Sequence, residues 1–217
     1  MKKILITIAV ISATLVAGAD IILTGIIDGS DSSPKGIEFY ITGSMDLTGF
    51  TVESESNGGD PLSWSTAYTF SGTYSAGFYY LTSTSSDMIN TFSSAIADNT
   101  IDDGSFVQNG NDAFRILNAS SMVIDVFGDP SEVTDSADFS IRWAYNDSFA
   151  YRKSGVAASA TFSEGSWYLP GSDYIDNNGG NDALAPFGTY VIPEPATFSM
   201  VALSGLFLMI VRRMSRT

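Results

Sequence analysis

The chain has 217 residues, enough for one domain, with a formal net charge of −14 and an apolar fraction of 44%. It contains no cysteine and no histidine, which excludes disulfides, thiol nucleophiles, Ser-His-Asp triads and histidine-based zinc sites. Between Asp20 and Tyr190 it carries 23 acidic residues against five basic ones, a balance that repels nucleic acid and anionic lipid. Its 14 Phe, 10 Tyr and 3 Trp favour a folded domain over a disordered chain.

The amino terminus has the three parts of a secretory signal peptide. Met1-Lys2-Lys3 is basic, residues Ile4 to Val16 are apolar, and Ala17-Gly18-Ala19 is a small-residue cleavage motif. We expect residues 1–19 to be removed by signal peptidase after the chain passes the Sec translocon. The mature chain then begins at Asp20.

The first mature segments have the patterns of β-strands. Residues Asp20 to Gly29 are β-branched and apolar and end in a turn signal. The next run, Lys35 to Thr42, alternates between apolar and polar residues, which predicts a half-buried strand. Its two faces carry Ile37, Phe39 and Ile41 on one side and Glu38 and Tyr40 on the other. Asp46 to Val52 predicts another strand, closed by Asn57-Gly58-Gly59, whose residues tolerate positive φ.

Further short strands follow at intervals of about ten residues. They are predicted at Ala67–Phe70, Gly77–Thr82, Ala113–Leu117 and Val123–Phe127. Residues Ser86 to Ala97 are the best helical candidate, because four apolar side chains recur there at helical spacing. Many short strands with little helical periodicity predict a mainly β fold, an antiparallel β-sandwich. Without a disulfide its stability must come from apolar burial, at about 25 cal/mol per Å².

A series of short motifs follows a fixed order from Gly36 to Trp167. They are Gly36-Ile-Glu-Phe-Tyr, Asp46-Leu-Thr-Gly-Phe-Thr-Val, Asn57-Gly-Gly, Asn109-Gly-Asn-Asp-Ala-Phe-Arg-Ile-Leu, Val123-Ile-Asp-Val-Phe-Gly, Trp143-Ala-Tyr, Phe149-Ala-Tyr-Arg-Lys and Phe162-Ser-Glu-Gly-Ser-Trp. In this order they resemble the bacterial lamin-tail-like domain, which implies an immunoglobulin-like antiparallel β-sandwich over residues 20–170. The chain differs from the family pattern at Asn111, which replaces an aspartate and removes one charge from any inherited cation site. Residues 171–192 are expected to form an acidic Asn- and Gly-rich linker.

Two acidic, Asn-rich loops are candidate sites for a hard cation. The first contains Asp102, Asp103, Asn109, Asn111 and Asp112, and the second contains Asp173, Asp176, Asn177, Asn178, Asn181 and Asp182. Calcium takes six to eight oxygens from carboxylates, amides and carbonyls, so calcium is the one cofactor that these loops suggest. Neither loop matches the EF-hand pattern. The alternative is that their side chains form Asx turns and satisfy local backbone donors.

Large aromatic residues are candidates for a second kind of ligand site. Trp64 and Tyr168, expected in loops, are candidates for stacking on a sugar ring. Trp143 and Trp167 are expected in the core instead. No motif assigns a catalytic residue, and a carboxylate pair for glycoside hydrolysis needs a cleft that the sequence does not reveal. We therefore expect a protein without enzymatic activity.

The carboxyl terminus combines three signals. Pro193-Glu194-Pro195 is followed by an apolar run at 197–211, which predicts a short transmembrane helix, and then by Arg212 and Arg213. The arginines favour a cytoplasmic end, which leaves the domain outside the cytoplasm. This 193–217 segment resembles the PEP-CTERM sorting signal. The resemblance implies recognition by exosortase, a membrane-embedded enzyme that cleaves near Pro-Glu-Pro, while an unprocessed single-span anchor is the alternative.

These signals together predict an exported, non-enzymatic surface or exopolysaccharide-matrix protein. As a precursor it is expected in the inner membrane, and after processing at the cell surface or in the extracellular matrix. The alternative function is an extracellular module that binds polysaccharide or calcium. The expected partners are the exosortase-like enzyme, the Sec translocon, signal peptidase and, in the alternative, exopolysaccharide, with no role for nucleic acid.

Overall fold

The computed structural model describes residues 20–56, 58, 62–104 and 108–192. The predicted signal peptide (1–19) and the predicted sorting signal with its transmembrane helix (193–217) lie outside these residues. Among the residues that are described, no helix has the length and apolarity to span a bilayer. They form a mainly β fold with antiparallel sheets and few helices, as the sequence predicts.

The described chain is built from short elements. Its strands are β1 (Ile21–Asp28), β2 (Lys35–Ile41), β3 (Met45–Asp46), β4 (Thr51–Glu55), β5 (Ser65–Thr69), β6 (Thr73–Tyr74), β7 (Gly77–Thr82), β8 (Thr100–Asp102), β9 (Ala113–Leu117), β10 (Val123–Phe127), β11 (Ser148–Arg152) and β12 (Trp167–Tyr168). The helices are α1 (Ser85–Phe92) and α2 (Tyr174–Asn177), with 3-10 turns η1 (Ser30–Ser32), η2 (Ser94–Asn99), η3 (Pro130–Glu132), η4 (Glu164–Ser166) and η5 (Asp182–Leu184).

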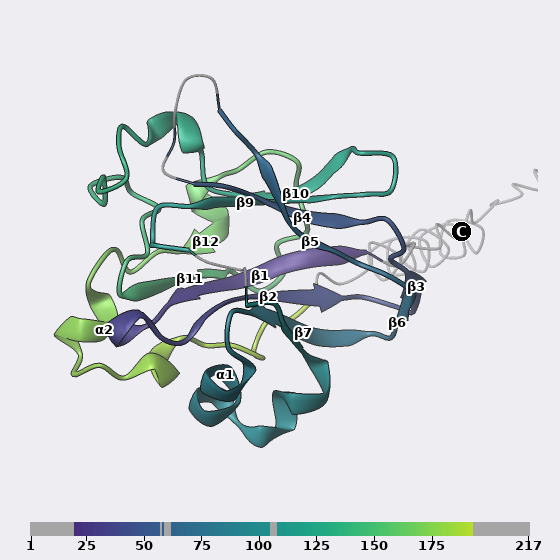
Figure 1. Cartoon of the computed structure of the whole chain (residues 1–217), viewed down its shortest axis with the longest axis horizontal. Helices are drawn as coiled ribbons and strands as arrows, with labels where there is room; N and C mark the ends of the chain where they lie inside the picture. The colour runs from purple at the N-terminus through teal and green to yellow at the C-terminus, as the bar shows by residue number, and fades with distance from the viewer. Residues whose placement is uncertain (1–19, 57, 59–61, 105–107, 193–217) are drawn as a thin grey trace, which may run out of the picture. The chain divides into compact units, whose positions relative to one another are not determined.

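The strands form two main sheets and a small ribbon. The six-stranded sheet has the order β12-β11-β1-β2-β7-β8, the four-stranded sheet has the order β10-β9-β4-β5, and β3 pairs with β6. The pair β7–β8 is parallel, and α1 with η2 forms the crossover that a parallel connection needs. Figure 1 shows the four-stranded sheet on one side of the six-stranded sheet and α1 on the other.

Several predicted elements are confirmed. The strands predicted at 77–82, 113–117 and 123–127 match β7, β9 and β10 at both ends. The strand predicted at 67–70 is β5, which begins two residues earlier, at Ser65. The helix predicted at 86–97 is divided into α1 and η2, because Ser93 has a φ of 142° that no helix accommodates.

One apolar core lies between the two main sheets. Phe39 of the six-stranded sheet and Phe114 of the four-stranded sheet are both fully buried in it. The ring of Phe127 meets those of Trp143 and Trp167 edge-on, with centroids 5.7 and 4.8 Å apart. The core position predicted for both tryptophans is therefore confirmed.

The outer face of the six-stranded sheet, opposite this core, is covered as well. A second cluster of buried apolar side chains lies there, contributed by the sheet, by α1 and by the segment 171–192. Strand β1 is consequently buried along its whole length. The prediction of a half-buried strand at Lys35–Thr42 is wrong for this reason: Glu38, expected on an exposed face, is 0% exposed.

Residues 171–192, predicted to be a linker, pack onto the six-stranded sheet instead. Ile175, Ala185 and Tyr190 are buried in the outer cluster. The compact unit that holds the sheets continues past residue 170 to the end of the described chain. The predicted domain boundary is corrected accordingly, because a few irregularly spaced apolar residues in this polar segment are enough to fasten it to the sheet.

Candidate functional site

Strand β1 runs between two different ends of the domain. At its start, the N–H of Thr42 donates to the carbonyl of Asp20 at 2.9 Å, and the ring of Tyr190 lies 6.1 Å from that of Tyr40. We call this the terminal end, because the described chain enters it at Asp20 and leaves it after Tyr190. The opposite end, where β1 finishes at Asp28, we call the loop end.

The first predicted cation loop is divided between the two sheets. Asp102 ends β8 in the six-stranded sheet, and its carboxylate accepts the backbone N–H of Ser85 at 3.0 Å. This contact caps the first turn of α1 and lowers the pKa of Asp102. Asp103 follows, with its N–H donating to the carbonyl of Thr82 at 2.9 Å. Asp102 and Asp103 therefore bind to α1 and to strand β7 beside them at the edge of the six-stranded sheet.

Asn109, Asn111 and Asp112 precede β9 at the loop end, in the four-stranded sheet. The N–H of Asn109 donates to the Asp112 carboxylate at 3.0 Å, a local contact between side chain and backbone. The buried amide of Asn111 donates to the carbonyl of Asp135 at 3.2 Å. Within the described ranges, no three acidic side chains are arranged to hold a metal ion. These contacts favour the backbone-satisfying alternative over a calcium loop.

The second acidic loop lies beside the first, which the sequence does not predict. Gly110, at a φ of 89°, packs so closely on Asn146 that a Cβ there would lie 2.3 Å from the Asn146 backbone. The carbonyl of Asn146 in turn accepts the N–H of Asp173 at 2.8 Å. Burial raises the pKa of Asp147, and the nearby carboxylates of Asp176 and Asp173 raise it further. The loop end is thus a concentrated acidic surface.

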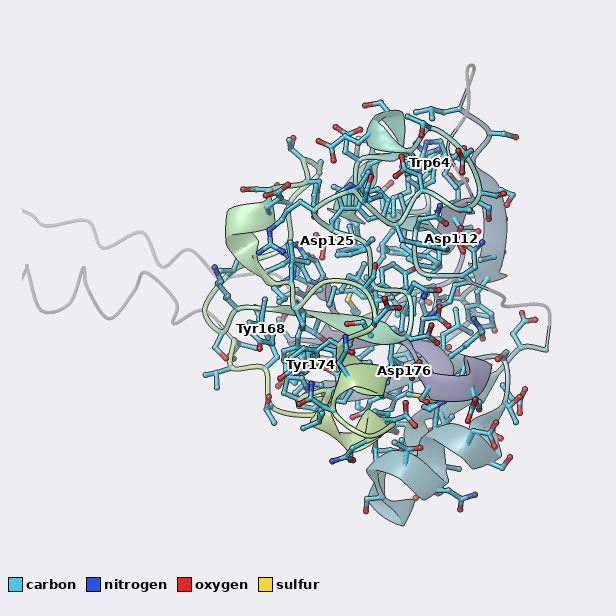
Figure 2. The ribbon with its side chains drawn as sticks, turned by 90° about the vertical axis from the view of Figure 1, so that its left-hand side faces the viewer. Trp64, Asp112, Asp125, Tyr168, Tyr174 and Asp176 are labelled. Atoms are coloured by element: carbon cyan, nitrogen blue, oxygen red, sulfur yellow. The ribbon has the colours of Figure 1, made fainter. Side chains whose placement is uncertain are left out.

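Of the two predicted stacking residues, Tyr168 is the more exposed. It is 49% exposed on the edge strand β12, its hydroxyl hydrogen-bonds to Tyr174, and both rings contact Phe149 at centroid distances of 5.9 and 5.8 Å. Trp64 is half-buried, with the guanidinium of Arg115 4.2 Å from the centre of its ring. Figure 2 shows Tyr168 beside Tyr174 and Trp64 in a separate part of the domain. The two predicted residues therefore do not share one surface.

A buried ion pair joins the two sheets, and the sequence analysis assigns no role to either of its residues. Nη2 of Arg152 on β11 lies 2.6 and 2.7 Å from the two carboxylate oxygens of Asp125 on β10. Three backbone N–H groups, those of Leu23, Val126 and Ser159, also donate to this carboxylate. Burial raises the pKa of Asp125 to about 6, against the lowering effect of these partners. The carboxylate is therefore ionised at neutral pH, and the pair holds β10 to the six-stranded sheet.

Glu38 is a second buried carboxylate, on the outer face of β2. It accepts hydrogen bonds from the hydroxyls of Thr24 at 2.7 Å and Tyr151 at 2.9 Å, and from the N–H of Gly188. The hydroxyl of Tyr80 is a fourth partner. Burial raises the pKa of Glu38 to about 7, although these donors lower it. Because its side chain has no solvent exposure, it does not face any site that a substrate can enter.

Lys35, which is partly buried, belongs to a third polar group, at the loop end. Its ammonium donates to the carboxylate of Asp28 and to the carbonyl of Gln108. The amide of Gln108 donates to the carbonyl of Ile27. Among the described residues, the amide oxygen of Gln108 and the hydroxyl of Ser148 are buried without a hydrogen-bond partner. A metal ion placed here would face the charge of Lys35, so this group does not favour a cation site.

The carboxylates described above make structural contacts. The two largest carboxylate networks are enclosed, and in the first predicted loop Asp102 caps α1 while Asp112 accepts a nearby backbone N–H. The predicted sorting residues Pro193, Glu194, Pro195, Arg212 and Arg213 lie outside the described residues. Comparison of the chain with protein-family models, with curated proteins and with solved structures found no match.

Replacement of Asp125 by alanine should destabilise the domain strongly, because it leaves the Arg152 guanidinium buried without its partner. Breaking a buried ion pair in this way costs about 3 to 5 kcal/mol, whereas a partly exposed pair contributes about 0 to 1 kcal/mol. Glu53→Ala, which breaks the partly exposed pair with Arg115, is the matched control. Urea unfolding followed by tryptophan fluorescence measures both losses. Equal losses would contradict a special role for the buried pair.

The free energy of unfolding should fall as the pH rises from 5 to 8, because of Glu38. Its pKa is about 7 in the fold and about 4.3 in an unfolded chain, so the stabilising contribution is complete below pH 4 and is lost through pH 7. The loss between pH 5 and pH 8 amounts to about 2 to 3 kcal/mol. Glu38→Gln removes the titration, while that of Asp125 stays common to both proteins. Parallel pH profiles for the two proteins would contradict the assignment.

Proposed function

We propose that the chain is an exported, non-enzymatic protein of the cell surface or exopolysaccharide matrix, sorted through a carboxyl-terminal signal of the PEP-CTERM type. The Sec translocon and signal peptidase process its amino terminus. An exosortase-like membrane enzyme then acts on the precursor in the inner membrane, with the domain outside the cytoplasm. The domain itself is of the immunoglobulin-like, lamin-tail-like kind.

The observation that carries this proposal is the position of the two chain ends. Asp20, the first residue after the predicted signal peptide, and Tyr190, three residues before Pro193, both lie at the terminal end of the domain. The amino-terminal signal and the carboxyl-terminal anchor both act at the same membrane. A domain whose two termini leave from one side can stay close to that membrane during both steps. The acidic loop end is then directed away from the membrane.

The charge distribution supports the same orientation. The loop end carries Asp147, Asp173 and Asp176; burial raises the pKa of Asp147, and repulsion by the other two carboxylates raises it further. Such a surface is repelled by anionic lipid headgroups and is well hydrated. An acidic outer surface and enclosed polar networks suit a matrix component better than an enzyme. The immunoglobulin-like assignment has the support of two sheets around one core.

Sorting is tested by replacing Pro193, Glu194 and Pro195 together by alanine. The variant should accumulate as an unprocessed precursor in the inner membrane, because the enzyme loses the motif that it recognises. Membrane fractionation and the mass of the isolated protein measure the outcome. Ala196→Ser, beside the motif, is the control that should be processed normally. An unchanged mature mass and location of the triple variant would sink the sorting hypothesis.

A second candidate function, polysaccharide binding, is favoured by the pair Tyr168 and Tyr174. Their rings are supported from below by Phe149, and Tyr168 is half exposed at the sheet edge. A rigid aromatic face with hydroxyl groups is the kind of surface on which sugar rings stack. The negative domain favours a neutral polysaccharide over an anionic one. The calcium-binding alternative has less support, because the described residues hold no acidic group of three that fits a metal.

Tyr168→Ala should weaken retention of the protein on the producer's neutral polysaccharide by about tenfold, the equivalent of 1.4 kcal/mol of stacking. Affinity electrophoresis in a gel that contains the polysaccharide measures the retention. Trp64→Phe is the control, because Arg115 already covers that ring and little contact is lost. Loss of retention with the control but not with Tyr168→Ala would place the sugar elsewhere, and no retention of the unchanged protein would remove this candidate.

A further inference from the structure

The last described segment, Phe187 to Tyr190, is held in an aromatic socket, and we call it the clasp. The ring of Phe187 stacks on those of Phe92 and Tyr80, with centroids 4.8 and 6.2 Å away. It lies directly over Gly25 of β1, where a Cβ would come within 2.5 Å of the Phe187 ring. The missing side chain at Gly25 is what lets the ring reach the sheet. The socket is therefore shaped for an aromatic residue.

The backbone of the clasp is bound as well. The N–H of Gly188 donates to Glu38, and those of Thr189 and Tyr190 donate to the hydroxyl of Tyr151 at 3.1 and 2.9 Å. Because Tyr151 accepts both N–H groups, its own proton is directed to Glu38, 2.9 Å away. Three successive N–H groups are thus satisfied by one carboxylate and one phenol. Proteins recognise a bound peptide in this manner, with a side-chain pocket and a row of backbone contacts.

The clasp ends close to the predicted sorting signal. Only Val191 and Ile192 separate Tyr190 from Pro193, and the carbonyl of Val191 is itself bonded to the N–H of Gly155 at 2.8 Å. The described chain is therefore bonded to the domain up to two residues before Pro193 in the sequence. An enzyme that cleaves a peptide must surround extended chain on both sides of the bond. With the clasp closed, the residues that precede the sorting signal are bonded to the domain and are not available to such an enzyme.

We propose that the clasp is a releasable docking site for an aromatic-Gly peptide, filled by the chain's own Phe187–Tyr190, and that its release admits the sorting enzyme to Pro193-Glu194-Pro195. This inference rests on the proposed sorting function and adds its regulation. In the closed state the precursor is held uncut. In the open state the segment after Ala185 becomes extended chain that the enzyme can bind.

Release of the clasp is coupled to deprotonation of Glu38. The groups that face its carboxylate are Thr24 on β1, Tyr80 on β7, Tyr151 on β11 and the Gly188 N–H of the clasp, and none of them is ionised at neutral pH. Opening hydrates the carboxylate, so its pKa falls and a proton is released. Between pH 5 and pH 7 the opening equilibrium then rises by up to about tenfold per pH unit. Glu38→Gln abolishes this dependence.

A disulfide lock tests the proposal in the full chain, which has no cysteine of its own. The hydroxyl of Ser154 accepts the N–H of Val191 at 3.2 Å, so Ser154→Cys with Val191→Cys puts two thiols on chain segments that are in contact. Pulse-chase of the precursor in producing cells should show processing slowed at least about tenfold, the equivalent of 1.4 kcal/mol. Dithiothreitol should restore it. Each single-cysteine variant is a control, and the mass of the precursor reports whether the bond has formed.

A loosening variant provides the opposite test and does not depend on the lock. Phe187→Ala empties the socket, so processing should be at least as fast as in the unchanged chain, and the amides of residues 188–190 should exchange at least about tenfold faster. Phe162→Ala, a truncation in the core between the sheets, is the matched control and should leave these amides protected. Hydrogen exchange of the full chain, read by mass spectrometry, measures both.

The outcomes separate the two proposals. If the oxidised, locked chain is processed at the unchanged rate, or if the amides of 188–190 exchange freely in the unchanged chain, the clasp proposal is overturned and the sorting function stands. If the unchanged chain is never processed, the sorting function fails and the clasp has no gating role. Slow processing of the locked chain, rescued by reductant, supports the proposal.

Discussion

Burial of both faces of the six-stranded sheet is the constraint on which the rest of the structure depends. One face meets the four-stranded sheet, and the other meets α1 and residues 171–192. A polar group on such a sheet has no access to water and must find partners inside the protein. On the inner face, the Arg152 guanidinium is paired with the Asp125 carboxylate. On the outer face, the Glu38 carboxylate accepts hydrogen bonds from the tyrosine hydroxyls around it. The two networks thus have one cause.

The parts of the fold that could be predicted are those with a local cause. Strands β7, β9 and β10 have compact apolar patterns between turn residues, and their bounds follow from the sequence. An alternating sequence shows which residues of a strand are polar. Whether a polar residue is buried depends, however, on which other segments cover that face of the strand. The alternation places Glu38 on an exposed face of its strand. The segment 171–192 that covers this face comes from far along the chain, so the alternation does not reveal the burial. That cover could not be recognised, since Ile175, Phe187 and Tyr190 follow no strand or helix period.

The candidate site likewise has features that the sequence predicts and features that it does not. The residue types at the loop end could be predicted, but the meeting of its two acidic loops could not, because it depends on the close contact between Gly110 and Asn146. Exposure was predicted for both Trp64 and Tyr168. Tyr168 lies on a sheet edge, while Trp64, just before β5, is covered by Arg115 of β9, which β4 separates from β5 in the sheet. A covering side chain from another strand leaves no signature beside the residue that it covers.

The separation of contacting residues along the chain has a consequence for the order of assembly. Arg152 contacts Leu23 across 129 residues, and Gly188 contacts Glu38 across 150. Contacts this distant form late, after the loops between them have closed. In the proposed export, β1 leaves the translocon first and is soon followed by its neighbour β2, but its other neighbour, β11, emerges much later. On this proposal the chain completes its fold only as its tail arrives, and a membrane-anchored tail holds the unfinished chain in place until then.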